Sequence, residues 1–448
     1  MFKKLIVLIM AAILLITGCQ AVNGVDLNKM VLNSAQIKSS QSKTTLSLDL
    51  KYSKTKVDKE TLKVLNLLNH MKLEVETKMQ DSNTVSLAGN IILYKKGKIP
   101  VRLYMDKKQM VILLDNAKKP IRIPVDSGSS SDQQLIKDVQ TKLLAPVVRN
   151  LPNPFPAHLK VTPNTTFKVH GATVKGHRVQ AQVYANELPK LLETFLTNLS
   201  KDEKAIADIV NAVNEINKAA GDNTKMTKDE FKAGIEQFKQ MLPELKNDPA
   251  YKSLLTSKNN LKTDIFLDKN YYERKTSTTL NINSIPDGQG LTGVTLKINN
   301  ETWNINKKVT ASKIKRYSNY LNENATPEQF LATLDKKKSV LYSAMTSMMY
   351  QPSKALNKSQ VSVTNNKGKK ADIITVKSIK NNSILKGAVI KVYSNGGNLL
   401  AVIEAKSKTA VLTVKQLGKN SGKVYVTIQH AKKAESAKVA IAYKAEKR

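Results

Sequence analysis

Short segments in which apolar and polar residues alternate constrain the fold of this chain more than any other feature. The apolar members of the first four segments are Leu46, Leu48, Leu50 and Tyr52; Met71, Leu73, Val75 and Met79; Val85, Leu87, Ile91 and Leu93; and Val101, Leu103 and Met105. A period of two places one face of each strand in a core and the other in water. The pattern therefore predicts an antiparallel meander whose strands share one apolar face.

Helical periodicity occurs before and after this meander, and alternation then returns. The helices are expected over 25–36, 131–147, 186–199, 206–216 and 227–242, with Asp26, Ser131, Asn186 and Thr227 near their starts. A strand pair over 167–183 is expected to turn at Lys175–Gly176. Further strands are expected over 261–282 and 294–305, the latter pair with a hairpin turn at Asn299–Asn300. Thr326 and Pro327 begin a last helix.

The length of the chain favours more than one domain. With 448 residues it is too long for one ordinary core, and a hydrophobic content of 41% suffices for globular folding. We expect an α+β domain over 25–350, built from a curved antiparallel sheet and a helical block. Residues 351–370, rich in Ser, Asn and Lys, are typical of a linker. Short strands at close spacing over 371–448 predict a small all-β sandwich.

The first residues have the pattern of an export signal. Lys3 and Lys4 precede an apolar run, and Ile16, Thr17 and Gly18 lead to Cys19, which is the sole cysteine. This tetrad resembles the lipobox of bacterial lipoproteins, which usually has Leu where Ile16 stands. The resemblance implies a signal peptide over 1–18, a diacylglycerol with acyl chains such as palmitate on Cys19, and a tether over 19–24. An ordinary secretory signal with a chance cysteine is the alternative.

The order of the elements also has a known counterpart. Two blocks of strands on either side of a helical block resemble the half-barrel of the lipoprotein-carrier and mycobacterial lipid-binding lipoprotein class. The resemblance rests on element order and on no specific motif. It implies a curved sheet with helices on its concave side, which could hold an acyl chain.

The C-terminal segments resemble a known module more closely. Residues 389–393, 397–400, 416–418 and 422–426 are similar to an immunoglobulin-like module at the ends of surface proteins in Paenibacillus-like bacteria. The family often has Gly-Asp where this chain has Lys386-Gly387-Ala388, so one turn is expected to differ. The resemblance implies a spacer or adhesion unit.

The charge of the chain indicates which partners it attracts. Lys and Arg number 72 against 36 Asp and Glu, a formal net charge of +36. Such a charge attracts polyanions, and for an exported protein these are lipid headgroups and anionic cell-wall polymers. Nucleic acid is not expected, because export removes the protein from the chromosome and aromatic residues are only 5%. The alternative is that the lysines simply keep the protein soluble.

No motif in the sequence carries recognisable chemistry. His170 and His177 are the closest pair among five histidines, but no third ligand accompanies them at metal spacing, so we expect no metal and no cofactor. Asp106 and Asp268 could be imagined as the paired carboxylates of a hydrolase, although Asp before Lys in a turn is usually only a turn residue. The methionines Met345, Met348 and Met349 fit a core or a contact surface better than a copper site.

The sequence therefore predicts a non-enzymatic envelope lipoprotein. It would be held to the outer face of the cytoplasmic membrane by its diacylglycerol and would extend into the cell wall, where it would contact anionic wall polymer or lipid. The alternatives are a lipid carrier with an acyl chain in the half-barrel and, third, a hydrolase with an unrecognised site.

Overall fold

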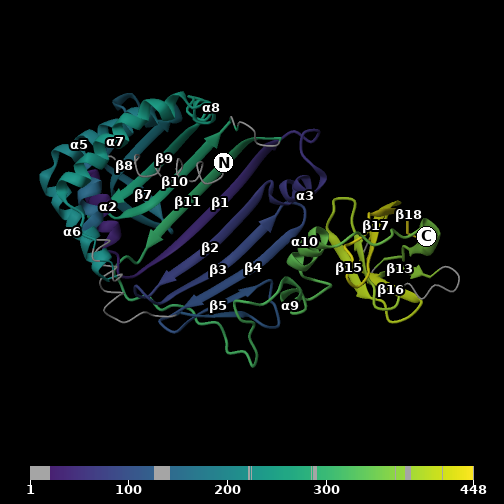
Figure 1. Cartoon of the computed structure of the whole chain (residues 1–448). Coiled ribbons are helices and arrows are strands. Elements are labelled where there is room, and N and C mark those ends of the chain that lie inside the picture. Colours follow the sequence, from purple (N-terminus) through teal and green to yellow (C-terminus); the bar gives the residue numbers. More distant parts are fainter. Residues whose placement is uncertain are drawn as a thin grey trace.

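The computed structural model describes residues 21–125, 142–219, 222, 224–283, 285, 290–368, 370–378, 385–415 and 417–446. Most of these residues belong to one large antiparallel sheet, which is not closed on itself (Figure 1). Its strands are β1 (Ser40–Tyr52), β2 (Met71–Met79), β3 (Val85–Leu93), β4 (Gly97–Met105), β5 (Gln109–Leu114), β6 (Ile121–Pro124), β7 (Leu159–Val169), β8 (Ala172–Tyr184), β9 (Asn260–Asp268), β10 (Glu273–Ile282) and β11 (Leu291–Trp303).

The sheet consists of two meanders joined through strands that are distant in sequence. The order is β6-β5-β4-β3-β2-β1-β11-β10-β9-β8-β7, so the pairing of β1 with β11 connects the two halves. In this pairing Leu46 lies opposite Ile298, and Leu48 lies opposite Leu296. The expected α+β class and the antiparallel sheet are thereby confirmed.

Helices gather at both ends of the sheet (Figure 1). They are α2 (Leu27–Ala35), α3 (Lys59–Leu68), α5 (Leu188–Lys201), α6 (Glu203–Ala219), α7 (Lys228–Asn247), α8 (Pro249–Lys252), α9 (Pro327–Leu331) and α10 (Val340–Met349), with short 3-10 turns at Pro156–His158, Ala185–Glu187 and Lys358–Gln360. Asp26, Thr227 and Thr326 cap α2, α7 and α9 as expected, because each side chain accepts hydrogen bonds from backbone N–H groups of the first turn. The short helix α3 was not predicted.

Two predicted turns are wrong. The chain between β7 and β8 turns at His170–Gly171, where both residues have positive φ, +47° and +80°. Gly176 instead lies within β8, where an added Cβ would come within 1.8 Å of the Leu267 carbonyl oxygen, so this glycine permits a close approach of strands. Asn299 and Asn300 lie in the middle of β11 and pair with Thr45 and Thr44 of β1.

The C-terminal module contains two small sheets that enclose a core. One has the order β12-β13-β16 and the other β15-β14-β17-β18. The strands are β12 (Val361–Thr364), β13 (Asp372–Lys377), β14 (Val389–Tyr393), β15 (Leu399–Glu404), β16 (Thr409–Val414), β17 (Gly422–Gln429) and β18 (Val439–Tyr443). Ile374, Ile390 and Val426 are fully buried between the sheets.

The segment 351–370, expected to be a linker, contributes to this module. It contains β12, and its Leu356 and Val361 are buried in the module's core. The Ser353 N–H donates to the carbonyl of Ala434 at 2.8 Å. The chain therefore passes directly from α10 into the C-terminal module.

Within the described ranges, no helix is long and apolar enough to cross a membrane.

Candidate functional site

One face of the large sheet, here called the apolar face, is defined by the side of β1 that carries Leu46 and Leu48. Directly opposed residues of antiparallel strands share a face. The register places Leu73 of β2 beside Leu46, and Ile298 of β11 on its other side. Extended through the remaining pairs, the same side carries Leu87, Ile91, Ile99, Val101, Leu103, Ile112, Leu114, Leu280, Leu296, Ile265 and Val179. The alternation in the sequence thus produces a nearly continuous aliphatic surface.

Helices cover this face at its two ends. At the β7–β9 end, Leu27 and Met30 of α2 pack with Val161, Val179 and Ile265. Leu188 and Leu191 of α5 pack there with Ala181, Val183 and Leu261. At the β2–β4 end, Ala344 of α10 packs with Leu93 and Ile99, and Leu67 of α3 lies against the same cluster. These contacts anchor the helices to the margins of the apolar face.

The centre of the apolar face is less well covered. Its large aliphatic side chains are half-buried, and they do not belong to the packed clusters formed by the described residues: Leu46, Leu48, Leu73, Leu87, Leu103, Ile112, Leu296 and Ile298. Burying such a side chain fully contributes about 1.5–3 kcal/mol, so partial exposure of a whole row forgoes a substantial part of the available stabilisation. A contiguous apolar surface that is left partly exposed in this way commonly marks a binding surface.

A row of hydroxyl and amide groups interrupts the apolar face toward one end of β1. Ser42 lies opposite Thr302, and Thr44 lies opposite Asn300. The Thr44 hydroxyl donates to Asn300 Oδ1 at 2.9 Å, and Asn300 Nδ2 donates to the Thr302 hydroxyl at 3.1 Å. The row continues through Thr276, Thr278 and Thr263 of the neighbouring strands. The face is therefore amphipathic along the strands, with hydroxyl and amide groups and the carboxyl group of Glu273, which lies opposite Leu267, at one end and aliphatic groups beyond them.

The opposite side of the sheet, here called the polar face, carries charge. Ser47 of β1 lies between Lys72 of β2 and Lys297 of β11. Part of this face is covered by the chain after β11. The Ser312 N–H donates to the Ser86 hydroxyl at 2.8 Å, which holds this segment over β3.

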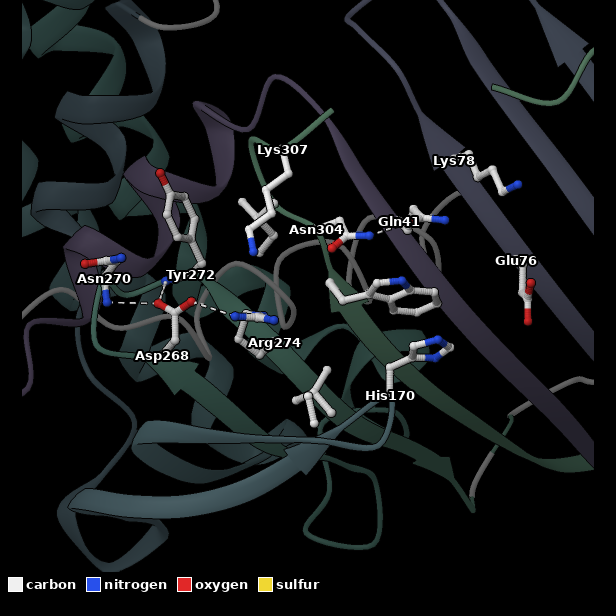
Figure 2. Close-up of a pocket in the computed structure, with 14 residues that line it drawn as sticks. Gln41, Glu76, Lys78, His170, Asp268, Asn270, Tyr272, Arg274, Asn304 and Lys307 are labelled. Carbon is white, nitrogen blue, oxygen red and sulfur yellow. Dashed lines mark hydrogen bonds and ion pairs between the residues drawn. The ribbon is translucent and has the colours of Figure 1, made fainter. Parts of the chain in front are cut away.

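The polar face also contains a hollow of about 820 Å³ at the end of β1 and β11. Figure 2 shows side chains from separate elements that line it, among them Gln41, Lys78, His170, Arg274 and Lys307. The imidazole of His170 stacks on the indole of Trp303, with ring centroids 3.9 Å apart and an interplanar angle of 3°. The turn that carries His170 is fixed to β11, because the His170 backbone N–H donates to Glu301 Oε2 at 3.0 Å.

Arg274 is fixed in this hollow by two contacts. Its Nη1 donates to Asp268 Oδ2 at 3.0 Å, and its Nε donates to the Thr302 carbonyl at 2.9 Å. The other oxygen of Asp268 accepts the N–H groups of Asn270 and Tyr272. Asp268 is thus a turn residue that positions Arg274. Asp106 likewise accepts the N–H groups of Lys108 and Gln109 in its own turn, between β4 and β5, so the structure does not bring the two aspartates together.

The other residues singled out from the sequence lie apart. His177 is on β8, where its ring stacks on Tyr271 and burial lowers its pKa; it does not join His170 at the turn. Met345 packs beside α9, whereas Met348 and Met349 are exposed. Groups of three or more potential metal ligands are absent from the part of the chain that the structure describes. The lipobox residues Ile16, Thr17 and Gly18 and the lipidation residue Cys19 lie outside the described residues.

A buried polar cluster joins the C-terminal module to α10. Glu435 lies 3.0 Å from Lys391 Nζ and accepts hydrogen bonds from the hydroxyls of Tyr393, Thr427 and Ser343, the last on α10. Burial raises the pKa of Glu435, but the Lys391 charge and these hydrogen bonds outweigh it, so the pKa is lowered. The pKa of Tyr393 is raised by burial and by the neighbouring carboxylate.

No protein-family model matches the chain, and a comparison with curated proteins finds no significant match.

Proposed function

We propose that the protein is a non-enzymatic, lipid-anchored protein of the bacterial cell envelope that holds acyl chains on the apolar face of its sheet. The observation that carries this proposal is the row of half-buried aliphatic side chains, including Leu46, Leu73 and Ile298, at the centre of that face. Acyl chains are long, flexible and purely apolar, so they can cover such a row without demanding hydrogen bonds. The adjoining hydroxyls and amides of Thr44 and Asn300 suit the uncharged part of a headgroup or its ester groups.

The leader of the sequence supports the location in this proposal. A diacylglycerol on Cys19 would hold the protein at the outer face of the cytoplasmic membrane, because two acyl chains anchor firmly where one binds reversibly. A Cys19→Ser variant is expected to be released into the medium. A variant that stays with the membrane fraction would contradict lipid anchoring while leaving acyl-chain binding open to its own test.

Acyl-chain binding is tested directly by solvent extraction of the purified protein followed by mass spectrometry of the extract. A matched pair of variants locates the site. Leu46→Asp places a carboxylate at the centre of the apolar face, whereas Ser47→Asp places one on the polar face between Lys72 and Lys297. Contact with each methylene contributes about 0.8 kcal/mol, so the loss of two or three contacts lowers affinity for a fluorescent fatty acid roughly thirtyfold. Ser47→Asp is expected to bind normally.

Two results would contradict acyl-chain binding. One is an extract with no lipid from protein that also fails to bind the fluorescent fatty acid. The other is equal affinity of the Leu46→Asp and Ser47→Asp variants, because an apolar-face site cannot tolerate a carboxylate at its centre.

A second candidate function is contact with an anionic envelope polymer, favoured by the excess of lysine and by exposed lysines such as Lys43 and Lys297 on the polar face. Retention on isolated cell walls is expected to fall with salt and with removal of the anionic polymer. Retention that depends on neither would contradict this candidate.

A further inference from the structure

We infer that the hollow beside Trp303 is a binding site for an anionic carbohydrate. It lies on the polar face, so it is separate from the surface proposed for acyl chains. This inference rests on the second candidate function, contact with an anionic polymer, for which it proposes a defined location. The volume of the hollow, about 820 Å³, falls within the range of small-ligand pockets, which is roughly 300–1,000 Å³.

The first observation is the ring platform. Trp303 and His170 stack in parallel, and His170 is exposed. Ring faces attract the weakly positive C–H groups of a sugar. Amide groups of Gln41 and Asn304 line the same hollow and offer both donors and acceptors for hydroxyl groups.

The second observation is the backbone at His170. The turn His170–Gly171 has positive φ at both residues, the geometry of a type I′ turn, in which Asn-Gly is the preferred pair. Histidine is one of the non-glycine residue types enriched at positive φ, so it fits this turn while its ring lies on Trp303.

The third observation is the set of cations around the platform. Arg274 is held in place by an ion pair with Asp268 and by the Thr302 carbonyl, contacts that use two of the five N–H donors of its guanidinium. Lys307 is exposed and forms no ion pair with any described carboxylate. Lys78 donates to the Ser312 hydroxyl at 3.1 Å, and Glu76, two positions earlier on the same face of β2, also lines the hollow, so cations and carboxylates both border it. Arg and Lys together suit a phosphate group attached to a sugar.

The single tryptophan makes the site directly measurable. The chain contains one Trp, so all tryptophan emission comes from position 303. The full chain is titrated with glucose 1-phosphate, with glucose and with inorganic phosphate, while emission is followed. We expect a saturable change with glucose 1-phosphate at about millimolar concentration, the affinity of a ligand worth roughly 4 kcal/mol. Glucose and phosphate alone are expected to bind at least about fivefold more weakly, since each makes only part of the contacts.

Two pairs of variants separate binding from folding. His170→Asn keeps the preferred turn chemistry and removes the ring, so it is expected to fold normally and to weaken binding about tenfold. Lys307→Ala is compared with Lys308→Ala, its exposed neighbour outside the hollow, and only the former is expected to weaken binding, by about fivefold.

Several outcomes would overturn the inference. They are unchanged emission with glucose 1-phosphate in the wild-type protein, equal affinity for inorganic phosphate alone, and wild-type affinity in both His170→Asn and Lys307→Ala. Retention on cell walls distinguishes the inference from the candidate function. If these two variants keep full salt-dependent retention, the protein binds the polymer elsewhere and the hollow is not the site.

Discussion

Replacing Lys391 by Met would leave a carboxylate buried without its counter-ion at the junction of α10 and the C-terminal module. Only 6% of the Lys391 side chain and 19% of the Glu435 side chain are exposed. Glu435 also accepts short hydrogen bonds from Tyr393 and Thr427, both 2.6 Å, so it cannot move into solvent without breaking them. The Glu435 carboxylate is therefore expected to stay buried when Lys391 is replaced.

The expected loss of stability is large. Removing one partner of a buried ion pair typically costs about 3–5 kcal/mol, whereas replacing both partners by apolar residues is often nearly neutral. We expect Lys391→Met to lower the free energy of unfolding by that amount and Lys391→Met/Glu435→Leu to recover part of it. Lys63→Met removes an exposed pair with Glu60 and should cost less than about 0.5 kcal/mol.

The pH dependence gives the sharper test, because its sign should reverse. In the wild-type protein the pKa of Glu435 is lowered from its ordinary value of 4.5. Its contribution to stability is therefore present above that value and is lost as the pH falls below it. Without Lys391, burial should raise the pKa of Glu435 above 4.5. The variant should then regain stability as the pH falls through this raised pKa, since protonation removes the unpaired charge.

Urea unfolding followed by circular dichroism between pH 7 and pH 4 measures both effects. Trp303 emission reports the large domain separately, because the tryptophan lies at the end of β11. Amide exchange of β14 and β17 reports the C-terminal module. A cost of Lys391→Met no larger than that of Lys63→Met would contradict the role of the buried ion pair, and so would a penalty of Lys391→Met that grows as the pH falls.

Three further predictions concern single residues. Asp202 accepts hydrogen bonds from Arg149 and Asn150, and chiefly the Arg149 hydrogen bond lowers the pKa of Asp202 from 3.8 to about 2. Asp202→Asn should therefore lower the free energy of unfolding in urea by about 1–2 kcal/mol at pH 7, and by progressively less as the pH falls from 4 to 2. An undiminished cost at pH 2 would contradict this. Gly176→Ala should lower the unfolding free energy by about 2 kcal/mol or more through collision with the Leu267 carbonyl, and Gly171→Ala, with open space around it, by about 1 kcal/mol from its positive φ alone; the reverse order would contradict the strand contact. Thr227→Ala removes the cap of α7 and should cost about 1 kcal/mol of thermal stability, and an unchanged Tm would contradict the cap.

Much of the local structure followed from the sequence because it depends on neighbouring residues. Alternation identified the strands of the first meander, and the caps at Asp26, Thr227 and Thr326 were found from a side chain and the turn after it. The turn between β7 and β8 was misplaced because Lys175–Gly176 and His170–Gly171 are equivalent as dipeptides. What distinguishes them is the approach of β9 to Gly176, which is a tertiary contact.

The candidate sites were harder to predict because distant segments form them. The pairing of β1 with β11 joins residues 239 to 262 positions apart, and neither strand carries a signal for the other beyond a shared alternation. The hollow on the polar face collects Gln41, His170, Arg274 and Lys307 from four parts of the chain.

The same two-residue period that builds the sheet also explains how it could serve two ligands. Successive side chains of β1 point to opposite faces, so Leu46 contributes to an aliphatic surface while Ser47, between two lysines, contributes to a charged one. A sheet whose only task was structural would gain stability by packing both faces fully, at roughly 25 cal/mol for each Å² of apolar surface removed from water. The centre of the apolar face remains half-buried although helices pack at both of its margins. In the function that we propose, an acyl chain would provide the missing burial, and because the hollow beside Trp303 opens on the other face, occupation of one site would leave the other accessible.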